Sequence, residues 1–131
     1  GHPDHRVTAE LVRDACFVAG LAKLAPDVPK HRPHKVIHCV SFRQDFEKPT
    51  FVVDISDEFE QKMDAIRCFA IQFDGAKQAG EVYPAGPSLY DAIREQSASY
   101  GALIRVRYGE PFWTSETMAV HDIAALSVST F

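Results

Sequence analysis

Residues 51–55, with the sequence FVVDI, place the strongest constraint on the fold. Four of the five side chains are apolar and do not alternate with polar ones, which is typical of a strand buried on both faces of a parallel sheet. Such a strand needs a neighbour on each side. Only KVIHCVS at residues 35–41 has the composition of a second strand, and two strands make a marginal sheet. The sequence therefore predicts a sheet that this chain does not complete alone.

Three segments have the periodicity of amphipathic helices, and we expect them at residues 8–24, 56–73 and 88–106. Ser56 is expected to cap the second helix, and Ser88, with Asp91 three residues later, to cap the third. The apolar positions of the first two helices are Leu11, Ala15, Val18 and Ala22, and Phe59, Met63, Ile66, Ala70 and Phe73. Each set recurs every three or four residues, so each predicts one apolar helix face.

Helices and short strands together indicate an α/β layer fold, and 131 residues suffice for one domain at most. The glycine- and proline-rich residues 74–87 are expected to form a long exposed loop, and residues 108–113 (YGEPFW) an aromatic turn against the sheet. The chain opens at Gly1 without a methionine. We therefore expect residues 1–131 to be the C-terminal part of one larger domain whose other strands lie on another stretch of polypeptide.

Charge and composition exclude several classes of partner. The net charge is −4, which argues against a nucleic-acid or anionic-membrane surface, and no apolar run approaches the roughly 20 residues that span a bilayer. Cys16, Cys39 and Cys68 are widely spaced and odd in number, so they make a poor disulfide framework. We expect them to be small buried apolar groups in a reducing compartment, and the protein to be soluble and cytoplasmic.

The densest chemical cluster is His2-Pro3-Asp4-His5, just before the first predicted helix. Two imidazoles three residues apart can face one point, where each binds a metal ion when neutral or donates hydrogen bonds when charged. Asp4 could orient one histidine and raise its basicity. Two histidines fall short of the three protein ligands of a catalytic zinc ion, and a mobile histidine-rich start is the alternative interpretation.

A second group of candidate metal ligands comprises His31, His34, His38 and Cys39. On an extended strand His34 and His38 would share a face, but a basic loop that leads into a strand explains the same residues. Glycine-rich phosphate loops and a serine nucleophile elbow are both absent from the sequence.

In order and spacing, the segments of this chain resemble the C-terminal part of the LmbE-like zinc deacetylases, the GlcNAc-phosphatidylinositol de-N-acetylase family. Within that family the resemblance is strongest to the deacetylases of bacillithiol biosynthesis, which act on N-acetylglucosaminyl malate. The matching segments are GHPDH (1–5), FVAGL (17–21), KPTFVVDIS (48–56), FEQKMDAIRCFAIQF (59–73), ASYGALIRVRYGEPF (98–112) and MAVHDIAAL (118–126). The resemblance implies a Rossmann-like three-layer fold, a cytoplasmic hydrolase and a homo-oligomer.

The resemblance also implies a role for each residue of the first motif. His5 matches a ligand of Zn²⁺, His2 matches the histidine that polarises the acetamide carbonyl, and Asp4 matches the carboxylate that orients it. The family's first motif, Ala-His-Pro-Asp-Asp, supplies the other two zinc ligands and the general base, and this chain lacks it. We therefore expect N-acetylglucosaminide deacetylation only when another polypeptide segment supplies that motif.

Two alternatives stay open. The chain could be a non-catalytic truncated deacetylase module that serves as an assembly or binding surface. It could also serve the same chemistry on another amide, such as a mycothiol precursor.

Overall fold

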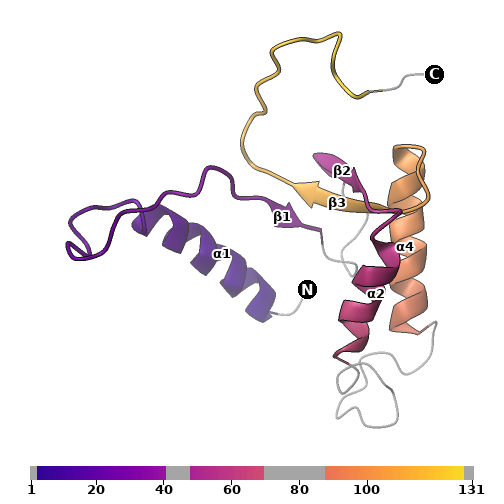
Figure 1. Ribbon diagram of the computed structural model, residues 1–131, viewed down its shortest axis with the longest axis horizontal. Helices are drawn as coiled ribbons and strands as arrows, with labels where there is room; N and C mark the ends of the chain where they lie inside the picture. The colour runs from indigo at the N-terminus through magenta and orange to yellow at the C-terminus, as the bar shows by residue number, and fades with distance from the viewer. Residues whose placement is uncertain (1–2, 41–47, 70–87, 129–131) are drawn as a thin grey trace.

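The computed structural model describes residues 3–40, 48–69 and 88–128. Along the chain the elements are α1 (Pro3–Val18), β1 (His38–Cys39), β2 (Phe51–Asp54), α2 (Phe59–Arg67), α4 (Leu89–Leu103) and β3 (Gly109–Trp113) (Figure 1). The described chain combines helices with a small sheet, which supports the α/β class predicted from the sequence. None of the helices in these three stretches has the length and apolar character to cross a membrane.

The sheet has the order β1-β3-β2, and both pairs of strands are antiparallel. Phe51 pairs with Phe112, and Asp54 pairs with Gly109. The prediction of a parallel interior strand at residues 51–55 is therefore wrong for the described sheet, where β2 is an edge strand. Its Val53 is 41% exposed. None of its four residues is fully buried: Phe51 and Val52 are half-buried, and Val53 and Asp54 are exposed.

The central strand is β3, which the sequence predicts as a turn because Gly109 and Pro111 resemble strand breakers. Pro111 has no N–H to donate. Its carbonyl accepts a hydrogen bond from the N–H of Val40 at 3.3 Å, where β1 ends. On the other side Pro111 lies opposite Val52. A proline is tolerated at this position because β1 is only two residues long. The N–H that Pro111 lacks would fall at the end of the hydrogen-bond ladder between β1 and β3.

The core lies between α2, α4 and the sheet. Figure 1 shows α2 and α4 at the same end of β2 and β3. Phe59 and Met63 are each 1% exposed and Ile66 packs against the same cluster, which confirms the first part of the predicted α2 stripe. Its remaining members, Ala70 and Phe73, lie outside the described residues, as does the loop predicted at residues 74–87. The other buried members of the cluster are Ile55, Leu89, Ile93 and Tyr108.

The ends of α4 have different causes. At its start the hydroxyl of Ser88 accepts a hydrogen bond from the N–H of Asp91 at 3.2 Å, which confirms the predicted cap. The helix ends at Leu103, three residues before the predicted end. Arg105 has a φ of 62°, and the next N–H, of Val106, returns to the carbonyl of Gly101 at 3.0 Å. This is the Schellman ending, which usually has glycine at the left-handed position.

Helix α4 approaches β3 closely at two glycines. A Cβ placed on Gly101 would lie 2.8 Å from the carbonyl oxygen of Val106 and 2.9 Å from the backbone nitrogen of Tyr108. A Cβ on Gly109 would lie 2.6 Å from Cγ1 of Val52 and 2.8 Å from the backbone nitrogen of Gly101. Two adjacent backbones therefore touch where any side chain would hold them apart.

Helix α1 differs from the other two because it has no buried residue. It begins at Pro3 rather than Thr8 and ends at Val18 rather than Leu24. Proline suits the first helical position, since its missing N–H would have no partner within the helix. In Figure 1 α1 lies apart from α2 and α4, on the far side of β1. After Thr114 the described chain, to residue 128, contains no helix or strand, in agreement with the absence of a period in its sequence.

The prediction that all three cysteines are buried is wrong. Cys39 and Cys68 are exposed, and Cys16 is half-buried. Cys39 lies on the two-residue strand β1 at the edge of the sheet, and Cys68 lies directly after α2, where the helix leaves the core. Both positions are at the surface because the described elements cover only one side of them.

Candidate site at the start of helix α1

The residues that the sequence singles out as catalytic or metal-binding fall at the start of α1. Asp4 lies in the first turn, where its negative charge complements the helix dipole, and His5 follows it; both are exposed. His2 lies outside the described residues, so the predicted convergence of His2 and His5 on one point stays a prediction. Asp4 and His5 point about 100° apart around the helix axis, because they are adjacent residues.

Asp4 is aligned with the apolar face of α1. Residues at positions 4, 7, 11, 15 and 18 recur at spacings of three or four, which places their side chains in one row along a helix. We call Val7, Leu11, Ala15 and Val18 the α1 stripe. The carboxylate of Asp4 lies at the end of this stripe that contains the histidine motif. One helix therefore carries both the candidate site and the α1 stripe and fixes their relative positions.

The donor chemistry at this end matches zinc, but the number of donors does not. An imidazole nitrogen of His5 is an ordinary zinc ligand, whereas a catalytic zinc ion takes three protein ligands. Within residues 3–40, 48–69 and 88–128, no group of three His, Cys, Asp or Glu side chains could hold a metal ion. The part of the chain that the structure describes thus supplies one ligand candidate and no complete site.

The second predicted cluster does not form a strand face. β1 contains only His38 and Cys39, so His34 lies before the strand. His38 packs its ring against Trp113 of β3, with the ring centroids 5.6 Å apart. His31 is joined to the loop after α1 through its backbone, since its N–H donates to the carbonyl of Ala19 at 2.9 Å. The contacts given for His31 and His38 are with other parts of the fold. The histidines of this cluster do not gather around a common point.

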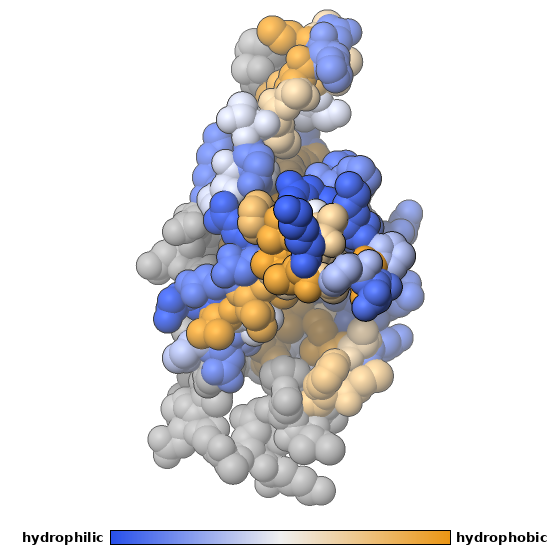
Figure 2. All heavy atoms as spheres, turned by 90° about the vertical axis from the view of Figure 1, so that its left-hand side faces the viewer, coloured by the Kyte–Doolittle hydropathy of each residue, from blue (hydrophilic) through white to orange (hydrophobic). Residues whose placement is uncertain are grey.

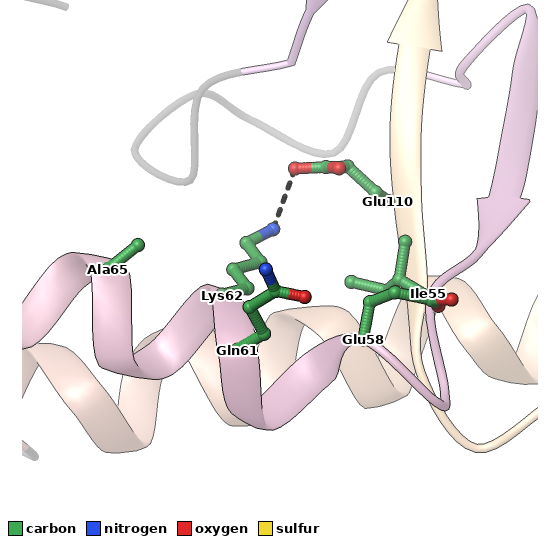
Figure 3. A pocket seen from close by; sticks show the side chains of 6 residues that line it. All are labelled: Ile55, Glu58, Gln61, Lys62, Ala65 and Glu110. Atoms are coloured by element: carbon green, nitrogen blue, oxygen red, sulfur yellow. Dashed lines mark hydrogen bonds and ion pairs between the residues drawn. The ribbon is translucent and has the colours of Figure 1, made fainter.

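A shallow hollow lies between α2 and β3. It is lined by Ile55, Glu58, Gln61, Lys62, Ala65 and Glu110 (Figure 3). Nζ of Lys62 donates to Oε1 of Glu110 at 2.7 Å, and the two side chains meet above the opening. The charges of this pair satisfy each other. The rest of the lining combines the apolar side chains of Ile55 and Ala65 with Gln61 and the exposed carboxylate of Glu58. One exposed carboxylate does not make a binding site, and we assign the hollow no chemistry.

Sequence reasoning missed a polar junction at the end of β2. The predicted capping role of Ser56 is wrong: α2 begins at Phe59 after Glu58, without a side-chain cap. The Ser56 hydroxyl instead donates to Oδ1 of Asp54 at 2.6 Å and accepts from the N–H of Tyr108 at 3.1 Å. The hydrogen bonds from Ser56 lower the pKa of Asp54. The Asp-x-Ser spacing is the signal that could have predicted this turn.

Arg94 of α4 joins the three core elements beside that junction. Its guanidinium lies 5.0 Å from the centre of the Phe59 ring and donates to the hydroxyl of Tyr108 at 3.0 Å. The rings of Phe59 and Tyr108 stack with their centroids 3.7 Å apart. The hydrogen bond to Tyr108 raises the pKa of Arg94, and Glu60 contributes in the same direction. Arg94 thus links α4 to Phe59 and Tyr108 in a structural network.

No protein-family model matches this chain. The resemblance to the zinc deacetylases therefore stays a prediction from the sequence motifs.

Proposed function

We propose that this chain is the C-terminal part of a zinc-dependent N-acetylglucosaminide deacetylase of the LmbE-like type. The observation that carries the proposal is the His-Pro-Asp-His motif at the start of an amphipathic helix, followed in order by the five other matching segments. The placement of Asp4 and His5 in the first turns of α1 supports it, because a helix holds both side chains in a fixed relation to each other. The substrate class is an N-acetylglucosaminyl conjugate such as N-acetylglucosaminyl malate.

Each residue of the motif has a distinct proposed role. His5 donates an imidazole nitrogen to Zn²⁺. His2, as a cation, donates a hydrogen bond to the acetamide carbonyl oxygen and stabilises the negative charge that develops there. Asp4 orients His2 and favours its charged form. Bound zinc supplies Lewis-acid activation of water in this class of chemistry.

The proposal requires zinc ligands from outside residues 1–131. His5 supplies one of about three protein ligands. The family's Ala-His-Pro-Asp-Asp motif would supply a histidine, an aspartate and the general base, and the 131 residues do not contain it. We therefore propose that catalysis requires residues 1–131 together with a further polypeptide segment that carries that motif.

The test uses the 131-residue chain co-expressed with the N-terminal segment of an LmbE-type deacetylase, spanning Ala-His-Pro-Asp-Asp and ending before the His-Pro-Asp-His motif. Zinc is measured by elemental analysis, and acetate release is measured on N-acetylglucosaminyl malate. We expect one zinc ion per complex and zinc-dependent acetate release. His5→Ala should lose zinc. His2→Ala should keep zinc and lose at least about 100-fold in kcat, the usual cost of one donor to an oxyanion.

Two results would contradict the proposal. Unchanged zinc content in the His5→Ala complex would remove His5 from the metal site. A stable complex that binds no zinc and releases no acetate from any N-acetylglucosaminide would favour the alternative of a non-catalytic module.

A further inference from the structure

An exposed aromatic pair lies at the end of the sheet. Strand β3 ends at Trp113, whose cross-strand partner in β1 is His38. In Figure 1 this end of β3 lies beside β1, away from α2 and α4. Trp113 is 44% exposed, although tryptophan side chains are highly buried on average. The ring centroids of Trp113 and His38 are 5.6 Å apart and their planes are tilted by 49°, so a second ring holds the exposed indole in place.

Hydrogen-bonding groups follow this pair along the chain. The N–H of Thr114 donates to Oγ1 of Thr50 at 3.2 Å, and the N–H of Glu116 donates to Oγ1 of Thr114 at 3.3 Å. The hydroxyls of Thr114 and Ser115 donate to the two carboxylate oxygens of Glu116 at 2.7 and 2.9 Å. A carboxylate oxygen accepts about two hydrogen bonds, so these hydroxyls leave each oxygen a further acceptor position. A fixed carboxylate therefore follows the exposed indole three residues later.

The carboxylate of Glu116 is charged at neutral pH. The hydrogen bond from Thr114 lowers the pKa of Glu116 most, and Ser115 and the positive charge of Arg13 act in the same direction. Arg13 belongs to α1, the helix that carries His5. Figure 2 views the molecule from the side on which α1 lies and shows hydrophilic residues around a central group of apolar ones. This side of the molecule thus presents polar groups next to apolar ones.

We propose that Trp113, His38 and Glu116 form a subsite for the pyranose ring of a sugar. The C–H groups on the face of such a ring carry a slight positive charge and are attracted to the negative face of the indole. The hydroxyls at the edge of the ring donate charge-assisted hydrogen bonds to Glu116. The subsite lies outside the histidine motif, so the inference goes beyond the proposed function. Only the choice of N-acetylglucosamine as the sugar rests on that function.

Two other occupants match these groups less well. An apolar protein surface over Trp113 would take the charged carboxylate of Glu116 out of water, which is costly. An organic cation could contact both the indole and the carboxylate. The positive charge of Arg13 acts on that same carboxylate, however, and would repel the cation. The hydroxyl groups of a sugar are uncharged, so they are not repelled.

The experiment uses the indole itself as the probe. Trp113 is the only tryptophan of the chain, so tryptophan fluorescence reports on this side chain alone. The 131-residue chain is titrated with N-acetylglucosamine, and binding is also followed by saturation-transfer NMR of the sugar, which does not depend on indole emission. We expect a saturable change in emission. Glu116→Gln should bind at least about 10-fold more weakly, because it loses the charged acceptor. Glu95→Gln, the same change at an exposed residue of α4, should bind like the wild type.

Two changes of the indole separate an aromatic contact from a general loss of structure. Trp113→Phe keeps an aromatic face and should retain part of the saturation transfer, whereas Trp113→Ala should abolish it. Circular dichroism checks that both variants keep the helix content of the wild type.

Absence of any response to N-acetylglucosamine would overturn the subsite, even if the complex with the N-terminal segment releases acetate. Equal affinity of Glu116→Gln and wild type, or preferential binding of tetramethylammonium, would also overturn it. Sugar binding that depends on Trp113 and Glu116, without zinc binding or acetate release in that complex, would leave the subsite standing and refute the proposed function.

Discussion

Replacing Gly101 by alanine tests the close approach of α4 to β3. The added methyl group would lie 2.8 Å from the carbonyl oxygen of Val106 and 2.9 Å from the backbone of Tyr108. Real Cβ atoms do not approach other heavy atoms so closely, so something must move. Every near neighbour is a backbone atom, and none can rotate away as a side chain would.

The expected loss of stability is the difference between two effects. Overpacking of a close contact costs about 1–3 kcal/mol. Alanine gains up to about 1 kcal/mol over glycine within a helix, although less near its end. We expect a net loss of about 1–2 kcal/mol. For a domain of this length that corresponds to a fall of about 4–8 °C in the melting temperature.

Gly20→Ala provides a matched control with the same chemical change. A Cβ at Gly20 would lie 2.5 Å from Nε of Arg32, but that atom belongs to a long side chain that can move. Thermal unfolding of the full chain should therefore show a change of less than about 0.5 kcal/mol for the control. A melting temperature of Gly101→Ala within about 1 °C of the wild type would show that the close approach does not constrain the fold. Equal losses of stability in the two variants would show the same.

Three further substitutions probe single contacts. Ser88→Ala should lower stability by about 1 kcal/mol in chemical denaturation because it removes the α4 cap, while Ser88→Asp should restore it. Arg105→Gly should raise stability by about 0.5–1 kcal/mol in the same assay, since the relief of a left-handed φ exceeds the entropy that glycine adds to the unfolded chain. The folded state lowers the pKa of Asp54, so its contribution is present above the ordinary carboxyl pKa and is lost as the pH falls through the lowered value. Asp54→Asn should therefore melt below the wild type at pH 7, and the difference should shrink towards pH 3; a constant difference would refute this linkage.

In helix α2 the predicted periodicity coincides with the observed burial. Phe59 and Met63 occupy one face of α2 and are both buried, as the spacing requires. The Ser88 cap was also predictable, since it needs only a local hydrogen bond to Asp91. Local signals of this kind depend on a few neighbouring residues and on no distant partner.

Features that depend on distant residues were not predictable. The central strand β3 contains Gly109 and Pro111, which have low strand propensity, and it forms because α4 and two other strands surround it. The predicted end of α4 lies three residues beyond the observed one, because Arg105 occupies the left-handed position where glycine would have signalled the end. Ser56 has the sequence context of a helix cap, yet its hydroxyl bonds to the backbone of Tyr108, 52 residues away.

The comparison of α1 with α2 shows what an amphipathic pattern specifies. Both segments have apolar residues every three or four positions, but Phe59 and Met63 of α2 are buried in the core while Leu11 in α1 is 65% exposed. The pattern is thus evidence that a helix requires an apolar partner, and it does not indicate whether that partner lies on the same chain. For α1 the described residues provide none that buries it. Asp4 and His5 lie on this same helix, so an interaction that buries the α1 stripe would also constrain the geometry of these two residues. We therefore expect Leu11→Gln, in the co-expressed complex that tests the proposed function, to lower zinc affinity without changing a ligand, as measured by zinc titration.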